Sequence, residues 1–326
     1  MQSLPVIRCL SLIGCLLAVS AAGTAGAADG RLVFSPQKSG SDATLLGVFF
    51  HDARQGWAVG AGGVVLQTLD GGKRWKSVAS GTRTLLTGVF FPDPARGWVV
   101  GANGTILHST NGGTRWTPQD SGTQAALYGL YFLSPEVGWA VGAAGTILMT
   151  EDGGRSWKDQ ASGVHAILYA VHFTDRQHGK AVGALGTILS TEDGGATWTV
   201  QDAQSSATFF DVVFTDPQTG WIVGNAGALF HTTTGGGRWI DQTLPCVRTC
   251  SRPTDLLRVR FTDQQNGWIV GERGTIYRTT DAGFSWVEQE HGTKASLFGL
   301  SFPNPANGWA SGERGVILHI EASDKR

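Results

Sequence analysis

The sequence predicts an all-β protein, a seven-bladed β-propeller of four-stranded blades in a ring closed by the N-terminal strand. Three observations support this fold. Tryptophans that follow a glycine recur every 41 residues along most of the chain, a period typical of propeller blades. The segments between them are short and rich in β-forming residues. The glycine-led segment occurs seven times, beginning at Gly56, Gly97, Gly138, Gly179, Gly220, Gly267 and Gly308.

The second copy of the repeat shows the four strands of one blade. Its segments LLTGVFF, GWVVG, TILHST and TRWTPQ are separated by Pro, Asn-Gly and Gly-Gly signals. These turn signals favour β-hairpins, and the spacing leaves no room for a long helix. We name the strands A to D, from the axis of the ring outward.

The closure of the ring is predicted from the seventh copy, which ends at Ile320 without a fourth strand. One repeat before Trp75 lies Phe34, and Ser39-Gly40 falls where Ser80-Gly81 falls in the next unit. We therefore expect the segment from Arg31 to Lys38 to supply strand D of the last blade. Such closure hides strand edges that would otherwise favour aggregation.

The turn between strands C and D resembles the Asp-box, or BNR repeat, of sialidases and other propellers. An aspartate in this turn bonds nearby backbone amides, and the tryptophan that follows packs between blades, so the motif predicts a structural role. Thr234 replaces the aspartate in the fifth copy, and Ala282 replaces the first glycine in the sixth. The six copies are TLDGGKRW, STNGGTRW, TEDGGRSW, TEDGGATW, TTTGGGRW and TTDAGFSW.

Residues 1–27 are predicted to be a secretory signal peptide. Arg8 precedes an apolar run, and Ala25-Gly26-Ala27 forms a plausible cleavage site. Cleavage before Cys15 to give a lipoprotein is the alternative. No later apolar run approaches the ~20 residues that span a bilayer, so we expect no membrane insertion. Residues 28–326 then form one propeller domain. We expect this domain to be a monomer, located in the periplasm or secreted from the cell.

The mature chain keeps two cysteines, Cys246 and Cys250, in an insertion at about residues 244–253. In an oxidising compartment they are expected to form a local disulfide; a metal site would need two more ligands, and no His or Cys lies near in sequence. The formal net charge of −1 argues against a nucleic-acid partner. No sequence motif indicates a cofactor.

One face of the predicted ring carries charged turns in its last blades. The turns between strands B and C read AGG, ANG, AAG, ALG and NAG in the first five blades and ERG in the last two. These turns and the cysteine insertion could form a docking patch for carboxylates of a partner, because guanidinium groups bind carboxylates through paired hydrogen bonds. The alternative is a solvated rim whose charges neutralise one another. The candidate residues are Arg248, Arg252, Glu272, Arg273, Glu313 and Arg314.

Strand A predicts a second charged region, beside the central channel. The position held by Gly47 in the first blade is Asp211 in the fifth and Arg258 in the sixth, with Arg260 two residues further on. We expect these three residues to line the channel and Asp211 to pair with Arg258, since buried charges usually need partners.

An enzymatic interpretation is the main alternative to a binding protein. A sialidase needs an arginine trio and a tyrosine nucleophile, yet the four tyrosines all occupy repeating strand positions. Two carboxylates such as Asp255 and Glu272 could instead form the acid pair of a glycoside hydrolase. A carbohydrate-binding propeller and a purely structural subunit also remain alternatives.

The repeat pattern LxGVxFxDxxxGWxVGxxGTILxTxDGGxxW resembles that of the photosystem II stability/assembly factor family over residues 31–320. The resemblance implies a seven-bladed propeller that acts without catalysis as an assembly chaperone. Its implied partner is a segment of a membrane or envelope protein, bound through an arginine-rich surface. Arg273 and Arg314 are the implied counterparts of that surface. The identity of the client does not follow from the sequence.

Overall fold

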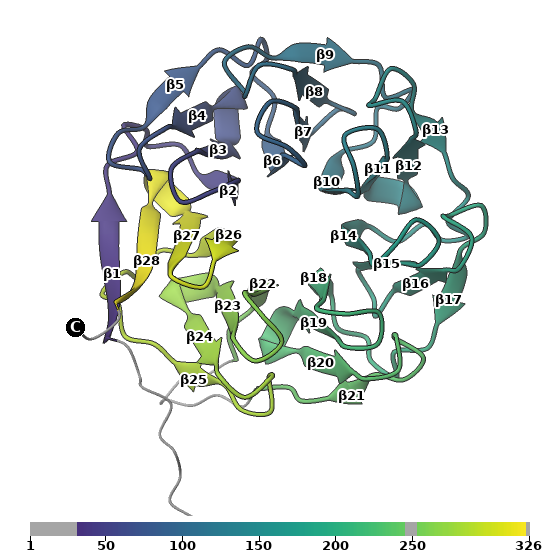
Figure 1. Ribbon diagram of the computed structural model, residues 1–326. Helices are drawn as coiled ribbons and strands as arrows, with labels where there is room; N and C mark the ends of the chain where they lie inside the picture. The colour runs from purple at the N-terminus through teal and green to yellow at the C-terminus, as the bar shows by residue number, and fades with distance from the viewer. Residues whose placement is uncertain (1–30, 245–252, 324–326) are drawn as a thin grey trace, which may run out of the picture.

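Seven four-stranded antiparallel sheets form a closed ring in the computed structural model, which describes residues 31–244 and 253–323 (Figure 1). This confirms the predicted all-β propeller. Strands A and B of each blade are the innermost pair. Strand A is β2 (Leu45–Phe50), β6 (Leu86–Phe90), β10 (Leu127–Phe132), β14 (Leu168–Phe173), β18 (Phe209–Phe214), β22 (Leu256–Phe261) and β26 (Leu297–Asn304). Strand B is β3 (Gly56–Gly60), β7 (Gly97–Gly101), β11 (Gly138–Gly142), β15 (Gly179–Gly183), β19 (Gly220–Gly224), β23 (Gly267–Gly271) and β27 (Asn307–Gly312).

Strands C and D complete each blade toward the rim. Strand C is β4 (Val65–Thr68), β8 (Ile106–Ser109), β12 (Ile147–Thr150), β16 (Ile188–Thr191), β20 (Leu229–Thr232), β24 (Ile276–Thr279) and β28 (Ile317–Ser323). Strand D is β5 (Lys76–Val78), β9 (Thr117–Gln119), β13 (Lys158–Asp159), β17 (Thr199–Gln201), β21 (Ile240–Asp241), β25 (Val287–Glu288) and β1 (Arg31–Gln37).

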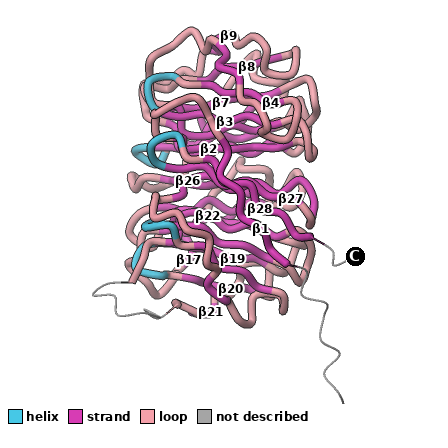
Figure 2. Tube along the Cα trace, turned by 90° about the vertical axis from the view of Figure 1, so that its left-hand side faces the viewer, coloured by secondary structure: helices cyan, strands magenta, loops and turns pink. Residues whose placement is uncertain are grey.

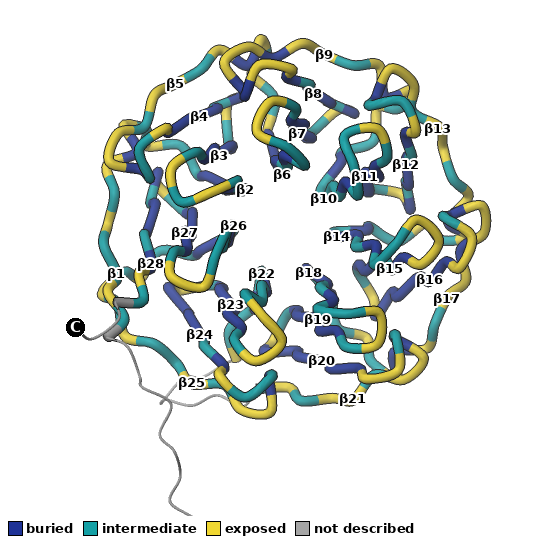
Figure 3. Tube along the Cα trace, in the orientation of Figure 1, coloured by how far each residue is buried: buried dark blue, intermediate teal, exposed yellow. Residues whose placement is uncertain are grey.

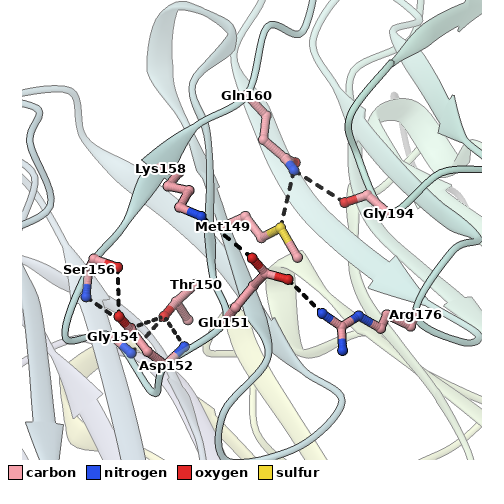
Figure 4. Close-up of polar contacts among 10 residues, drawn as sticks. All are labelled: Met149, Thr150, Glu151, Asp152, Gly154, Ser156, Lys158, Gln160, Arg176 and Gly194. Atoms are coloured by element: carbon pink, nitrogen blue, oxygen red, sulfur yellow. Dashed lines mark hydrogen bonds and ion pairs between the residues drawn. The ribbon is translucent and has the colours of Figure 1, made fainter.

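The N-terminal strand closes the ring as predicted. β1 pairs antiparallel with β28, from Arg31 opposite Ser323 to Gln37 opposite Ile317. The Gln37 amide also donates to the carbonyl of Gly71 in the first blade, at 2.8 Å. Gln160 makes the same contact across an internal boundary, with Gly194, at 3.2 Å (Figure 4). The closure therefore repeats the bonding found between sequential blades.

Packing between blades is carried by the tryptophans of strand B, which are buried with their neighbours while the outer strands stay partly exposed (Figure 3). Each of these rings stacks on a phenylalanine at or near the end of strand A in the next blade, as Trp57 does on Phe91, the residue after β6, with ring centroids 3.5 Å apart. Because buried aromatic rings contribute large apolar area, these stacks form a large part of the core at the six boundaries that have them.

The Asp-boxes hold their own turns, as expected for a structural motif. In the third blade, the Thr150 hydroxyl accepts from Gly154 N at 2.7 Å and donates to Asp152 Oδ1 at 2.9 Å (Figure 4). The backbone N–H and hydroxyl of Ser156 both donate to Asp152. The Ser156 bonds lower the pKa of Asp152 to about 2. The polar side chains of this Asp-box thus bond to other residues of the same turn.

Candidate functional site

The two faces of the ring are built from different segments. The turns between strands B and C bond to the D–A connectors, as Ala61 N does to Thr44 O at 2.9 Å. The Asp-boxes bond to the A–B turns on the opposite face, as Gly71 N does to Arg54 O at 2.9 Å. We call the first face the turn face; its short 3₁₀ turns lie together along one side of the ring (Figure 2). These turns are η1 (Ala61–Gly63), η2 (Ala143–Gly145), η3 (Asn225–Gly227), η4 (Glu272–Gly274) and η5 (Glu313–Gly315).

Arg273 and Arg314 occupy the middle position of their turns. Both have positive φ, 54° and 53°, and both side chains are exposed. Residues with this conformation are uncommon outside glycine and asparagine, and the equivalent position in the first blade is Gly62. The turn geometry therefore presents each arginine to solvent on the turn face.

Glu313 is engaged with the backbone. Its Oε2 accepts the N–H of Ser296 at 3.2 Å, just as Asn225 Oδ1 accepts the N–H of Thr208 at 2.8 Å in the fifth blade. Within residues 31–244 and 253–323, the Arg314 guanidinium makes no hydrogen bond or ion pair. Hence Glu313 supports its turn, and the Arg314 side chain is exposed beside it.

Arg273 has a different environment. One of its Nη atoms lies 3.5 Å from the carbonyl of Pro253, and the side chain has further interactions. Arg248 and Arg252 of the predicted patch lie outside the described residues, as do Cys246 and Cys250 of the predicted disulfide. Of the predicted patch, the structure therefore describes Glu272, Arg273, Glu313 and Arg314.

A cavity of about 400 Å³ lies on the axis and is lined by strand A of all seven blades. Aromatic rings follow one another around its wall in blades one to four. Phe90 lies 5.6 Å from Tyr131, which lies 4.7 Å from His172, between ring centroids. Nearer the turn face, Tyr128 and Tyr169 are 5.3 Å apart. Much of the wall is therefore aromatic.

The charged part of this wall is formed by blades five and six. Asp211, Arg258 and Arg260 all line the cavity. Asp211 pairs with Arg260, through Nη1 and Oδ2 at 2.6 Å, instead of the expected Arg258. Arg258 Nη1 donates to the carbonyls of Leu257 at 2.8 Å and Phe210 at 3.3 Å. The pairing differs because Arg258 reaches back along its strand while Arg260 reaches the buried carboxylate.

Electrostatics in this cavity disfavour added positive charge. Burial, with a smaller contribution from the Arg260 cation, lowers the pKa of His172 to about 4. Burial also lowers the pKa of Arg258. His172 is therefore neutral at pH 7, and the two arginines remain the cations of the cavity.

Sequence reasoning missed a second cavity, at the boundary between blades four and five. Lys180 stands where the other blades have the strand-B tryptophan, and the substitution is visible in the segment GKAVG. A cavity of about 260 Å³ there is lined by Lys180, Asp175, His178 and Glu192, and shares His172 with the axial cavity. Burial lowers the pKa of Lys180. We call this cavity the Lys180 notch.

Asp255, one of the two residues considered for glycoside hydrolysis, has a structural role here. The Asp255 carboxylate accepts the N–H of Ala226 at 2.8 Å, and its carbonyl accepts the N–H of Glu272 at 3.0 Å. Asp255 thus joins the turns of two adjacent blades. In the part of the chain that the structure describes, no group of three or more His, Cys, Asp and Glu residues could hold a metal ion. The described elements likewise include no helix long and apolar enough to cross a bilayer.

Comparison with known proteins gives matches in sequence and in structure. The sequence profile described as "Photosynthesis system II assembly factor YCF48" matches residues 32–119, 156–248 and 247–326. No curated protein matches.

Several solved structures share the fold. "YCF48 bound to D1 peptide" is 21% identical, with a TM-score of 0.74, covering 89% of this chain and 97% of that one. YCF48 from Cyanidioschyzon merolae is 22% identical, with a TM-score of 0.73, covering 89% and 98%. A GH74 xyloglucanase from Xanthomonas campestris is 13% identical, with a TM-score of 0.70, covering 88% of this chain and 53% of that one. The same architecture thus occurs in binding proteins and enzymes, and structural likeness alone does not choose between them.

Proposed function

Since the chain belongs to the YCF48 photosystem II assembly factor family, we propose that it is a non-enzymatic propeller that binds a segment of a membrane or envelope protein. It acts as a scaffold or assembly chaperone for the complex that contains this client. The solved structure of YCF48 bound to D1 peptide supports a peptide segment as the class of partner.

The observation that carries the proposal is the exposed arginine pair of the turn face. Arg314 has positive φ, is exposed and has no bonded partner among the described residues, while Glu313 bonds to the backbone. A guanidinium offers five N–H donors in a planar fork that fits carboxylates. An acidic segment lying across blades six and seven would meet Arg273 and Arg314 together.

The proposed place of action is the periplasm or an equivalent compartment, reached after removal of residues 1–27. There the protein acts as a monomer, and the opposite, Asp-box face stays free of the client. Asp255, with its carboxylate bonded to Ala226, supports a scaffold over a glycoside hydrolase.

The test is crosslinking to isolated envelope membranes, with the captured protein identified by mass spectrometry. The test variant changes Arg273 and Arg314 to Glu. The matched control changes Arg115 and Arg155, two exposed arginines in the Asp-boxes, to Glu. Both variants change the net charge equally, but on opposite faces.

We expect the wild type and the control to capture the same membrane protein, and the turn-face variant to capture about tenfold less. Capture should also weaken with added salt, because exposed charges act mainly through screened attraction. Equal capture by both variants would contradict the proposed face. If no variant captures a protein but the wild type binds or cleaves glycans, the carbohydrate alternative is favoured.

A further inference from the structure

The axial cavity has an unbalanced charge. Among the residues that line it, Asp211 is the one carboxylate, while Arg258 and Arg260 are two guanidinium groups. His172 adds no charge at pH 7, because its pKa is lowered to about 4. The wall therefore carries one net positive charge in a confined space, where an unpaired charge is costly.

The arginines also keep unused hydrogen-bond donors. The bonds of Arg258 to described residues use Nη1 alone, on the carbonyls of Phe210 and Leu257. Arg260 likewise uses Nη1, on Asp211 and on the Val259 carbonyl. Since each guanidinium has five N–H donors, both retain Nε and Nη2 for a further acceptor. A carboxylate is the acceptor whose two oxygens fit this fork.

An aromatic wall lies across the cavity from these donors. Strand β22, which carries both arginines, lies opposite β6 and β10 in the ring (Figure 1). Strands β6 and β10 contribute Phe90, Tyr128 and Tyr131 to the lining. An occupant would therefore meet cations at one side and aromatic faces at the other. The volume of about 400 Å³ lies within the ~300–1,000 Å³ typical of small-molecule sites.

We propose that the axial cavity binds a small organic anion with a single carboxylate and an aromatic body. The carboxylate pairs with Arg258 and Arg260, which leaves the Asp211 pair in place and neutralises the remaining charge. The aromatic body packs against Phe90, Tyr128 and Tyr131, where ring stacking adds to burial of apolar area. This site is separate from the arginines of the turn face and does not depend on the proposed protein partner.

The test is isothermal titration of the full chain with benzoate, phenylacetate and indoleacetate. Each acid is compared with its neutral amide, which has the same body without the charge, and acetate serves as the charge without the body. We expect at least one aromatic acid to bind at least about tenfold more tightly than its amide, with acetate the weakest. Arg258→Gln should weaken that acid about 10- to 100-fold and leave its amide nearly unchanged.

Two further variants protect the test against misfolding. Arg258→Lys keeps the charge but loses the fork, so it should bind between the wild type and Arg258→Gln. Tyr128→Leu should weaken the acid and its amide alike, because it removes part of the aromatic wall. Arg155→Glu, an exposed change on the Asp-box face, is the control and should bind as the wild type does. The proposal is overturned if none of the three acids binds at millimolar concentration, or if the acids bind no better than their amides. It also fails if Arg258→Gln, folded by circular dichroism, binds as the wild type does.

Discussion

The boundary between blades four and five differs from the other six boundaries of the ring. At those six, a strand-B tryptophan stacks on the phenylalanine of the next blade, with ring centroids 3.5 to 5.2 Å apart. At the fifth blade, Phe214 faces Lys180 across the Lys180 notch. At this one boundary, a flexible lysine side chain and a cavity stand in place of the stacked tryptophan.

The replacement keeps part of the original geometry. The Lys180 amine donates to the Ser190 hydroxyl, and its stem lies against Gly236 of the next Asp-box. The indole of Trp57 occupies the same place against Gly113. Because each blade contacts mainly its neighbours, a repeat array can lose one tryptophan–phenylalanine stack while the packing of the other boundaries is kept. Aromatic stacking therefore holds six of the boundaries, whereas the boundary between blades four and five is joined by a lysine contact beside a cavity.

The largest expected effect on stability comes from removing a strand-B tryptophan at one of the six stacked boundaries. Trp139→Ala removes a fully buried ring that stacks on Phe173 at 3.5 Å. It should lower the free energy of unfolding by about 3–5 kcal/mol, because large aromatic deletions leave cavities. Lys180→Ala, the matched change in the next blade, should cost about 1 kcal/mol or less. Denaturant unfolding measures both; equal losses would show that Lys180 supports its boundary as strongly as a tryptophan does.

A smaller effect concerns pH, through His172 beside the Lys180 notch. Its folded pKa of about 4 lies below the ordinary value of 6.5, since burial and Arg260 disfavour the imidazolium. The stability it contributes is therefore complete above pH 6.5 and is lost as pH falls toward 4. His172→Phe, which restores the residue found at Phe90, should remove this loss, up to about tenfold in the folding equilibrium per pH unit.

The measurement is denaturant unfolding of His172→Phe and wild type between neutral and acidic pH. His165→Gln, on the exposed turn face, is the control and should follow the wild type. Burial also lowers the pKa of His108, His231, His291 and His319, which affects all three proteins alike. A constant difference between His172→Phe and wild type at every pH would be inconsistent with a neutral, buried His172.

The smallest expected effect is the repair of the unusual boundary. Lys180→Trp restores the repeat residue beside Phe214 and Gly236. It should raise the free energy of unfolding by about 0.5–2 kcal/mol, as consensus and cavity-filling changes commonly do. Denaturant midpoints compared with Lys180→Met, which removes the charge but adds no ring, would isolate the stacking contribution. A destabilised Lys180→Trp would show that the notch has closed too far to accept an indole.

Several parts of the structure were predictable from sequence because they depend on local pattern and repetition. The spacing of Trp57 and its equivalents predicted the blades, and the missing strand after Ile320 predicted the pairing of Arg31–Gln37 with β28. The Asp-box motif predicted turns that bond to themselves. The positions of Asp211, Arg258 and Arg260 on the axis followed from their place in strand A.

Other parts required the arrangement of side chains in space. Long arginine side chains have many rotamers, so their position in strand A does not decide whether Arg258 or Arg260 reaches Asp211. The bond from Ser296 N to Glu313 depends on how a connector meets the next turn. The Lys180 substitution was readable in the sequence, but its consequence, a cavity shared with His172, depends on two blades.

Repeat spacing was enough to establish a seven-bladed ring with its closing strand, the two faces of the blades and the positions at which blades four to seven depart from the repeat. Those features follow from hydrophobic period and turn chemistry, which act over a few residues. The folded ring was needed to show which of these non-repeat residues lie together. Asp211 pairs with Arg260, the two arginines lie across the axial cavity from Phe90 and Tyr131, and His172 lines the same cavity as Lys180. These encounters depend on the curvature of the ring and on rotamer choice, which repeat spacing leaves open.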